Sequence, residues 1–398
     1  MATLDTKGHE AAYLAERLVE LGARPWIVDI GLRGEPSVRA DLAREAVLAA
    51  GDAAGDTSAT DEREQAMTLM AAGAGRQLQA LHASGRLAGV VAIGGSKGTW
   101  MATTAMRALP WGVPKLMVAS TVAGDLRRYT GHRDIAFLPT VVDLAGLNDM
   151  TRLQLARGAA ALYGMVGVPT PSAEARGVVG MTMAGVVTPL ATRVQAGLAE
   201  RGVEAVIFPA NGAGGLALEE AIAAGRFSAV VDLALLEIGN HLLGGICSAG
   251  PNRLSAAGGG GLPQVVVPGA VEFANFAEAS TVPSGLRDRV QVEHTPAITL
   301  VRLTAAESAE VGRTIGERLS RSAGPVEVLV PLRGFSAYDR SGGPFEDVTA
   351  DAAFRAALGE SVGDRVALRE LDLHVNDPAF AAEVLAAASR LIPQEVAA

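Results

Sequence analysis

The chain has 398 residues, a formal net charge of −9 and 49% hydrophobic residues. This length suits two domains better than one, and the hydrophobic content excludes a largely disordered chain. Cys247 is the single cysteine, which excludes an internal disulfide and so a small disulfide-held scaffold. No apolar run reaches about 18 residues and the first ten residues are polar, so we expect no membrane span, no signal peptide and a cytoplasmic location.

The charges also argue against nucleic acid as a partner. The 34 Lys and Arg residues are outnumbered by 43 Asp and Glu residues, and basic residues occur only in short pairs such as Arg127 and Arg128. Nucleic-acid-binding proteins usually carry a basic stripe, and single strands need aromatic rings for stacking. With only four tyrosines and three tryptophans, we expect a small-molecule ligand instead.

Short apolar runs alternate with helical patterns in the first part of the chain. The runs cover residues 26–30, 90–93, 116–118 and 135–138, and the helical patterns cover 10–21, 37–49, 62–83 and 99–109. Short, continuously apolar runs are typical of parallel strands that helices cover on both faces. Strands that alternate with helices predict a doubly wound sheet.

The same rhythm restarts after a helical pattern at 151–163, which Asp149 can cap. Further apolar runs follow at 177–183, 205–208, 229–233, 265–267, 298–303 and 326–330. We therefore predict an α/β fold with two doubly wound, Rossmann-like parallel-sheet domains and a ligand cleft between them. The predicted domains are 1–148 and 177–398, joined by a linking helix and connector at 149–176.

A glycine-rich turn follows the apolar run at 90–93 and leads directly into a helical pattern. It consists of Gly94, Gly95, Ser96, Lys97, Gly98 and Thr99. Glycines let backbone N–H groups approach an anion, and the start of a helix attracts negative charge. The spacing is not that of a Walker loop, and a tight turn without a ligand is the alternative interpretation.

Two further loops are candidates for the same ligand. Asn211, Gly212, Gly214 and Gly215 follow the run at 205–208 and precede another helical pattern. Near the start of the chain, Thr6 could cap a helix while Asp5 and Lys7 point into the cleft. For this last loop, a solvated helix cap is an equally good interpretation.

Two side chains are candidates for acid–base chemistry. Glu237 follows the apolar run at 230–236, and His294 precedes Pro296 and a predicted strand. His241 lies four residues after Glu237, but no further ligand is close in sequence, so we predict no metal site. The motifs of α/β-hydrolases and of NAD-binding domains are missing.

Several motifs occur in an order that resembles one family. They are Thr-Leu-Asp-Thr-Lys-Gly at 3–8, Gly-Gly-Ser-Lys-Gly-Thr at 94–99, Val-Val-Asp-Leu-Ala-Gly-Leu-Asn at 141–148, Thr-Met-Ala-Gly-Val-Val-Thr-Pro at 182–189 and Asn-Gly-Ala-Gly-Gly at 211–215. The chain resembles the Tm-one-like family, which contains the amino-terminal ATP-binding domain of the tomato mosaic virus resistance protein and bacterial relatives. This resemblance implies a two-part α/β fold, a homodimer and ATP binding.

The chain also departs from that family at several places. Residues 233–236 are apolar where the family is often rich in threonine, and Asn240 stands where we expect an acidic residue. Met1 stands almost directly before the first motif, so we expect the first strand to be short, missing or truncated.

The leading hypothesis is a protein that binds ATP or another phosphorylated ligand, with Mg²⁺ as a possible companion. The phosphates would contact the loop at 94–99, with the loop at 211–215 opposite. One alternative is a small-molecule hydrolase, lyase or ligase that uses Glu237 and His294. Another is a ligand-sensing interaction protein.

Overall fold

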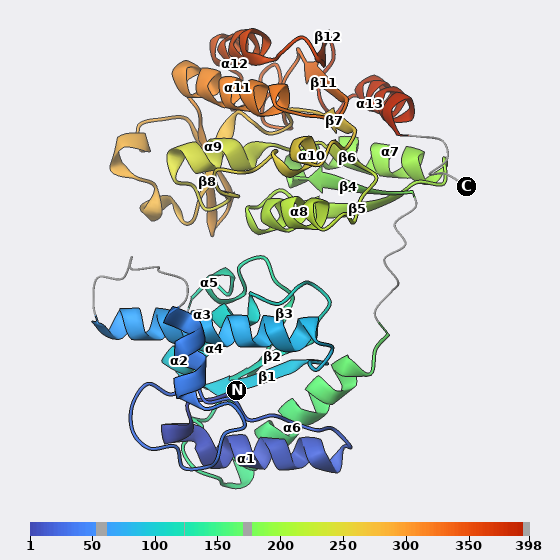
Figure 1. The fold of residues 1–398 in the computed structure, drawn as a ribbon. Coiled ribbons are helices and arrows are strands. Elements are labelled where there is room, and N and C mark those ends of the chain that lie inside the picture. Colours follow the sequence, from blue (N-terminus) through green and yellow to red (C-terminus); the bar gives the residue numbers. More distant parts are fainter. Residues whose placement is uncertain (53–61, 123, 170–176, 393–398) are drawn as a thin grey trace. The chain divides into compact units, whose positions relative to one another are not determined.

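The computed structural model describes residues 1–52, 62–122, 124–169 and 177–392. The chain divides into two compact units, Met1–Ser172 and Ala173–Ala398, each with a sheet of its own. Figure 1 shows their elements, and each unit is described by itself below. Among the described residues, no helix is long and apolar enough to cross a membrane.

The N-terminal unit is built on a parallel sheet in the order β1-β2-β3. Its strands are β1 (Val90–Gly94), β2 (Lys115–Ala119) and β3 (Ile135–Pro139). All residues of β1 and β2 are buried, as expected for parallel strands that helices cover on both faces. The prediction of a doubly wound α/β fold is confirmed for this unit.

Single residues extend this sheet beyond β1. Ile93 N donates to Met1 O at 3.1 Å, and Ala2 forms a parallel bridge with Asp29. Val28 in turn forms a parallel bridge with Leu42. The strand predicted at 26–30 is therefore reduced to isolated bridges.

Helices cover both faces of this sheet (Figure 1). They are α1 (Leu4–Glu20), α2 (Arg44–Asp52), α3 (Glu62–Ala83), α4 (Ser96–Met106), α5 (Arg127–Thr130) and α6 (Asp149–Val166). Helices α1 and α6 pack on the core that contains Val91 and Val118, whereas α3 and α4 pack on the core that contains Ala92 and Met117. These side chains alternate along the strands, so each face of the sheet has its own helix layer.

Helix α6 packs against α1 within the N-terminal unit. Its cap is Asn148 and not Asp149, because the Asn148 Oδ1 accepts hydrogen bonds from Met150 N and Thr151 N at 3.0 Å each. Thr151 Oγ1 completes a capping box by accepting from Asn148 N. Part of the predicted connector, residues 170–176, lies outside the described residues.

The C-terminal unit contains a six-stranded parallel sheet in the order β12-β11-β7-β6-β4-β5. The strands are β4 (Val178–Met183), β5 (Glu204–Pro209), β6 (Ala229–Asp232), β7 (Gln264–Val266), β11 (Val326–Pro331) and β12 (Val366–Leu371). Its helices are η1 (Gly185–Val187), α7 (Thr188–Ala199), α8 (Ala213–Ala223), α9 (Leu236–Leu243), α10 (Ala256–Gly259), η2 (Ala279–Thr281), η3 (Ser284–Leu286), α11 (Ala305–Ser320), α12 (Val348–Ser361) and α13 (Pro378–Leu391). The doubly wound prediction is confirmed here as well.

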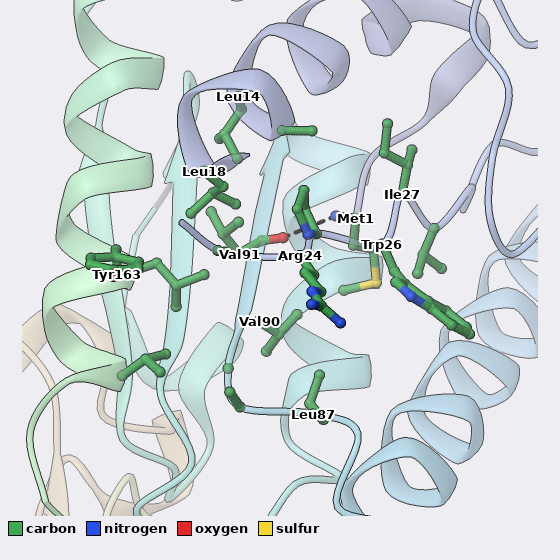
Figure 2. Close-up of a pocket in the computed structure, with 18 of the residues that line it drawn as sticks. Met1, Leu14, Leu18, Arg24, Trp26, Ile27, Leu87, Val90, Val91 and Tyr163 are labelled. Carbon is green, nitrogen blue, oxygen red and sulfur yellow. Dashed lines mark hydrogen bonds between the residues drawn. The ribbon is translucent and has the colours of Figure 1, made fainter. Parts of the chain in front are cut away.

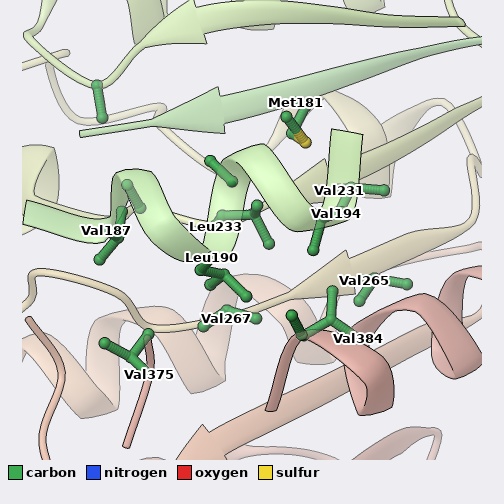
Figure 3. Close-up of a cluster of buried hydrophobic side chains, with 14 of the residues drawn as sticks. Met181, Val187, Leu190, Val194, Val231, Leu233, Val265, Val267, Val375 and Val384 are labelled. Carbon is green, nitrogen blue, oxygen red and sulfur yellow. The ribbon is translucent and has the colours of Figure 1, made fainter. Parts of the chain in front are cut away.

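The largest core of this unit lies between the sheet and helices α7 and α13. Figure 3 shows Leu190 and Val194 of α7 and Val384 of α13 near the strand residues Val231 and Val265. A second core joins the opposite side of the sheet to α9, α11 and α12. These two layers hold the strand ends, and so the loops that follow them, in fixed positions.

A separate antiparallel sheet has the order β8-β10-β9. It consists of β8 (Phe273–Phe276), β9 (Gln291–Thr295) and β10 (Ile298–Arg302). The sequence correctly predicts a strand near 298–303, but assigning it to the parallel sheet is wrong. The strand Gln291–Thr295 leads directly into β10, so the two form an antiparallel pair.

Both units place the first strand position between the second and the third. In the C-terminal unit, β4 lies between β5 and β6. In the N-terminal unit, the Met1–Ala2 position lies between residue 29 and β1. At such a switch point, the loops after the first and third strands diverge and leave room for a ligand at the carboxyl edge of the sheet.

Candidate functional site

The switch point of the N-terminal unit brings together two of the predicted loops. Because Met1 pairs with β1 through Ile93, the loops at 3–7 and 94–99 leave the sheet at adjacent positions. Asp5, Thr6 and Lys7 therefore share this edge with the glycine-rich turn. The strand order itself therefore groups these predicted residues.

The start of helix α4 has the properties of an anion-binding site. Gly95 is the N-cap residue and provides no side-chain cap, while the side chains of Ser96 and Lys97 are exposed. The first N–H groups of a helix lack intrahelical partners, and they attract negative charge. The backbone and side chains of Ser96 and Lys97 are therefore available to a ligand from solvent.

The other residues of this turn have structural roles. A Cβ atom at Gly94 would lie 3.0 Å from the Cα of Gly98 and from Thr99 N, so the strand can meet the helix only at a glycine. Thr99 is fully buried, its N donates to Gly95 O at 2.8 Å, and its side chain faces the Gly94 carbonyl. Gly94, Gly98 and Thr99 thus shape the turn from inside.

The first motif contacts the motif at 141–148. Lys7 Nζ donates to Leu144 O at 2.5 Å, and Gly146 N donates to Glu10 Oε1 at 2.6 Å. Helix α1 has a non-helical φ of −133° at Lys7, where this contact is made. Motifs more than 130 residues apart in sequence therefore meet at this edge of the sheet.

Thr6 does not cap helix α1, because the helix begins at Leu4 with Thr3 as its N-cap residue. Thr6 lies in the first turn, and its Oγ1 is 3.0 Å from Thr3 Oγ1. The prediction from the sequence thus places the start of this helix too late. Leu4, which is fully buried, is already the first core residue of the helix. Thr6 itself is exposed at the same edge.

Asp5 lies beside a second carboxylate that sequence reasoning missed. Its Oδ1 is buried and has no hydrogen-bond partner among the described residues. A Cβ atom at Gly31 would lie 3.2 Å from this oxygen and 3.0 Å from the Asp29 Oδ1, so both carboxylates border the same point. Asp29 is held by Leu4 N and Gly31 N at 3.0 and 2.8 Å. The sequence signal for Asp29 is its position as an acid inside the apolar run at 26–30.

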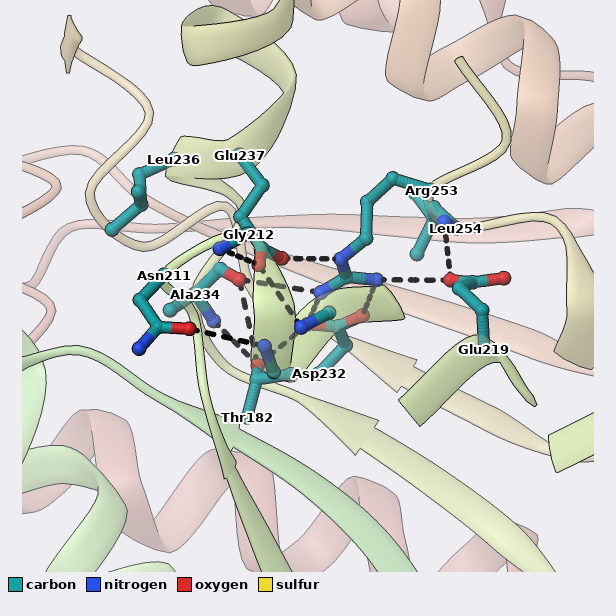
Figure 4. A network of polar contacts seen from close by, with 12 residues as sticks. Thr182, Asn211, Gly212, Glu219, Asp232, Ala234, Leu236, Glu237, Arg253 and Leu254 are labelled. Atoms are coloured by element: carbon teal, nitrogen blue, oxygen red, sulfur yellow. Dashed lines mark hydrogen bonds and ion pairs between the residues drawn. The ribbon is translucent and has the colours of Figure 1, made fainter. Parts of the chain in front are cut away.

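The glycine-rich loop of the C-terminal unit binds a carboxylate of the protein itself (Figure 4). Gly212 N and Gly215 N donate to Glu237 Oε1 at 2.7 and 3.1 Å, and Glu237 is fully buried. Asn211 Oδ1 accepts from Gly214 N at 3.0 Å. Two N–H groups predicted to bind a ligand therefore already have an anionic partner.

Arg253 completes this network and was not predicted. It is 1% exposed, and its Nε donates to Glu237 Oε2 at 2.6 Å. Its two terminal nitrogens form a bidentate pair with Asp232 at 2.7 and 2.8 Å, and Nη1 is 3.2 Å from Glu219. Asp232 also accepts from Thr182 Oγ1 at 2.6 Å. The sequence signals for this network are Glu237 and Asp232, an acid within the apolar run at 229–233.

Burial raises the pKa of the Glu237 carboxyl above its ordinary value, and the charge of Arg253 opposes this rise. Three donors hold the two carboxylate oxygens, from Gly212, Gly215 and Arg253. A general acid or base needs a free position toward its substrate. In this arrangement Glu237 fixes the loop at 211–215 to helix α9.

His294 lies elsewhere in the C-terminal unit, on strand β9 of the antiparallel sheet. It is exposed, and its Nδ1 is 2.9 Å from the Tyr338 hydroxyl. The structure therefore gives the two predicted acid–base residues separate elements and separate partners, and it does not join them into one group.

Both units match models of one uncharacterised protein family. The UPF0261 N-terminal domain matches residues 1–171, and the UPF0261 C-terminal domain matches residues 176–392. The chain belongs to the UPF0261 family. A UPF0261 protein of Clostridium tetani is 36% identical over 98% of this chain and 97% of its own length, and one of Rhizobium meliloti is 39% identical over 97% of each chain.

The resemblance to the tomato protein is also confirmed. The ToMV resistance protein Tm-1(GCR237) of Solanum lycopersicum is 32% identical over 303 residues, which are 74% of this chain and 40% of the tomato protein. The matching part of that protein is thus similar to most of this UPF0261 chain.

The UPF0261 chain also has a cavity at the carboxyl ends of β11 and β12, with several charged and polar residues in its lining. It has a volume of about 710 Å³, and Asp339, Asp351 and His374 are among its lining residues. Near it, burial and the charge of Asp339 raise the pKa of Glu272 to about 8, and burial and the same charge raise the pKa of Asp351 to about 7. Among the residues that the structure describes, no three His, Cys, Asp or Glu side chains are grouped to hold a metal ion.

Proposed function

We propose that this UPF0261 chain binds a nucleotide or another small phosphorylated ligand at the carboxyl edge of the N-terminal sheet. The observation that carries this proposal is the uncapped start of α4 at a switch point, with Ser96 and Lys97 exposed beside it. Backbone N–H groups and a lysine are the groups that commonly hold phosphate. ATP is the first ligand to test, because the Tm-one-like resemblance implies it.

The loop at 211–215 supports this assignment by contrast. It has the same glycine-rich character, but Glu237 supplies the anion that its N–H groups need. Helix α4, by contrast, has Gly95 as its N-cap residue and no side-chain hydrogen bond that caps it among the described residues. We therefore assign the phosphate to residues 94–97 and give the loop at 211–215 a structural role.

Asp5 is the residue that would hold Mg²⁺ together with the phosphates. Magnesium usually binds through one or two carboxylates, phosphate oxygens and water. The Asp5 Oδ1 has no hydrogen-bond partner among the described residues and lies at the same edge as the turn. The function proposed is binding, since Glu237 is held by three donors and supplies no free acid for a hydrolase, lyase or ligase.

Isothermal titration with ATP and MgCl₂ tests the proposal. We expect saturable heat for the unmodified chain and a Kd at least about tenfold higher for Lys97→Ala, which corresponds to the roughly 1.4 kcal/mol of one charged contact. Arg321→Ala is the matched control, because it removes one positive charge from a side chain that is 78% exposed in the other unit. Absence of heat at millimolar ATP, or equal losses in both variants, would contradict the proposal.

A further inference from the structure

Two cavities of this chain differ in the chemistry of their linings. The cavity of about 430 Å³ in the N-terminal unit is lined mainly by apolar side chains, among them Leu14, Leu18 and Val90 (Figure 2). The cavity of about 710 Å³ in the C-terminal unit has several charged and polar side chains in its lining. We call this second one the acidic cavity, after the carboxyl groups of Asp339 and Asp351 that line it.

The carboxyl ends of two neighbouring strands bring three acids together at the acidic cavity. Glu272 follows β7, and Asp339 follows β11, with which β7 pairs. Asp351 lies in the first turn of α12, in the connection from β11 to β12. Glu272 and Asp339 are only 2% and 1% exposed. Three carboxyl groups thus lie close together at the edge where open α/β sheets bind their ligands.

Arg302 balances part of this negative charge. Its Nη2 donates to Asp351 Oδ1 at 2.6 Å. Its Nη1 and Nε donate to the main-chain oxygens of Glu272 and Phe345 at 3.0 and 2.9 Å, so they are not used for a second carboxylate. One guanidinium therefore faces three carboxyl groups, and buried carboxylates without a cationic partner are costly.

His374 lines the same cavity but adds no cation. Its Nδ1 accepts a hydrogen bond from Asn376 N at 3.1 Å, so its Nε2 carries the ring hydrogen and donates it to Ser336 O at 2.9 Å. A charged imidazole has a hydrogen on both nitrogens and could not accept from Asn376 N. The hydrogen bonds of His374 therefore hold its ring in a neutral form.

The two arginines of the lining are exposed to solvent. Arg333 forms two hydrogen bonds with Asp372, at 2.8 and 2.7 Å, and Arg340 lies near the exposed Glu346 of the same lining. Exposed charges are screened by water and ions, so they stabilise buried acids only weakly. The inner part of the acidic cavity thus has more carboxyl groups than cations.

Two buried oxygen atoms at this place have no hydrogen-bond partner among the described residues. They are Glu272 Oε2 and Asn376 Oδ1, and Asn376 lines the acidic cavity. The other polar atoms of these side chains are engaged, since Glu272 Oε1 accepts from Ser336 Oγ and Asn376 Nδ2 donates to Val186 O at 3.0 Å. Buried acceptors normally have a donor. Both oxygens therefore indicate a ligand that donates hydrogen bonds.

We propose that the acidic cavity binds a small organic ligand through ammonium groups. An ammonium group supplies both the positive charge that the carboxyl groups lack and N–H donors for the oxygens of Glu272 and Asn376. A metal ion would supply charge without donors, and no three His, Cys, Asp or Glu side chains of the described chain are grouped to hold one. Because one guanidinium faces three carboxyl groups, a ligand with two ammonium groups matches the charge best.

Protons balance these acids when no other cation does. Burial and the charge of Asp339 raise the pKa of Glu272 to about 8. Burial and the charges of Asp339 and Asp347 raise the pKa of Asp351 to about 7. The charge of Arg302 opposes both rises in pKa. A bound ammonium ligand replaces these protons, so its binding at pH 7 releases protons to the buffer.

Isothermal titration with 1,4-diaminobutane at pH 7 tests the proposal. The uncharged 1,4-butanediol is the matched probe, and we expect saturable heat with the diamine and none with the diol. Asp339→Asn and Asp351→Asn should each raise the Kd at least about tenfold, as expected for the loss of one charged contact. Glu360→Gln, at an exposed position in the last turn of α12, should leave the Kd unchanged.

Two further measurements separate this proposal from its alternatives. Titrations in PIPES and in ACES, which differ in their enthalpy of ionisation, should give different heats because protons are released. Titration with MgCl₂ should give no heat that the two Asn variants reduce.

Several results would overturn the proposal. They are no heat at millimolar diamine, equal heats with the diol, equal heats in both buffers, or an unchanged Kd in folded Asp351→Asn. Displacement of the diamine by Mg²⁺ from the acidic cavity would overturn it in favour of a metal site. The comparison of diamine with diol uses the unmodified chain, so it decides the question even where a variant fails to fold.

Discussion

At the scale of single residues, Arg253 has the most demanding surroundings in the C-terminal unit. It is 1% exposed and contacts the carboxylates of Asp232, Glu237 and Glu219. A buried guanidinium is tolerated only while carboxylate partners balance its charge. The buried carboxylates likewise need the guanidinium to balance theirs. The network therefore connects β6, α8 and α9 at the carboxyl edge of the sheet.

Replacing Arg253 should be strongly destabilising. Arg253→Ala leaves Asp232 and Glu237 buried without their cation, and we expect the free energy of unfolding to fall by about 3–5 kcal/mol. Urea unfolding followed by circular dichroism measures this change. The exposed Arg321→Ala should change it by less than about 0.5 kcal/mol. A loss below 1 kcal/mol for Arg253→Ala would be at odds with the network described.

The raised pKa of Glu272 predicts how the free energy of unfolding depends on pH. Its pKa is about 8 in the folded protein and 4.5 as the ordinary value, so the folded state holds its proton more tightly than the unfolded state. The contribution of this group is fully present below pH 4.5 and is lost as the pH rises through 8.

Urea midpoints at pH 5, 7 and 9 check this prediction. We expect the midpoint of the unmodified chain to fall as the pH rises, and that of Glu272→Gln to fall less, because the amide does not titrate. Parallel pH profiles for the two proteins would show that Glu272 does not titrate as its burial requires.

Sequence reasoning found Glu237 but missed Arg253 and Asp29. Glu237 follows a long apolar run, which marks the carboxyl end of a buried strand. Arg253 follows no such run, and its partners lie 16 to 34 residues away in sequence. Pairing over such separations is decided by tertiary packing, which composition and spacing do not reveal.

At the scale of elements, Gly215 shows how the loop at 211–215 depends on the residue beneath it. A Cβ atom at Gly215 would lie 2.3 Å from a carboxylate oxygen of Glu237. The start of helix α8 can approach that carboxylate only at a glycine. The glycines that suggest a phosphate loop in the sequence thus make room for an internal acid.

Gly215→Ala should therefore destabilise the protein by about 1–3 kcal/mol, because the overlap forces the loop away from Glu237. Gly259→Ala is the matched control, since a Cβ atom there meets nothing within 4 Å. Thermal unfolding of both variants measures the difference. Similar melting temperatures would contradict the close approach.

The sequence predicts strands well where they are continuously apolar and poorly where they are not. The runs at 90–93 and 326–330 became β1 and β11, which are wholly buried. Strand β12 was missed because it is half exposed at the edge of its sheet and reads Val-Ala-Leu-Arg-Glu-Leu. Strand β9, with the sequence Gln-Val-Glu-His-Thr, lacks an apolar run for the same reason.

At the scale of the whole molecule, the two units repeat one strand arrangement around a switch point, and both show the same alternation of apolar runs and helical patterns in the sequence. The N-terminal unit leaves the start of α4 open to solvent, whereas the C-terminal unit fills its glycine-rich loop with Glu237. The repeated fold could be predicted from alternating strands and helices. The difference between the two loops depends on one side chain, that of Glu237, and its contacts with the loop at 211–215 are seen only in the structure.

The homodimer implied by the Tm-one-like resemblance is a prediction at this scale. Sedimentation equilibrium should give a mass of about twice the 40.7 kDa of one chain. The mass of a single chain at micromolar concentration would contradict the predicted homodimer.

The central claim, that phosphate binds at 94–97 and not at 211–215, is tested most directly by hydrogen–deuterium exchange with and without ATP and MgCl₂. The account predicts slower exchange in peptides that cover residues 3–7 and 94–99. It predicts no change at 211–215, where Gly212 and Gly215 already donate to Glu237. Slower exchange at 211–215 alone, or at neither loop with millimolar ATP, would contradict it.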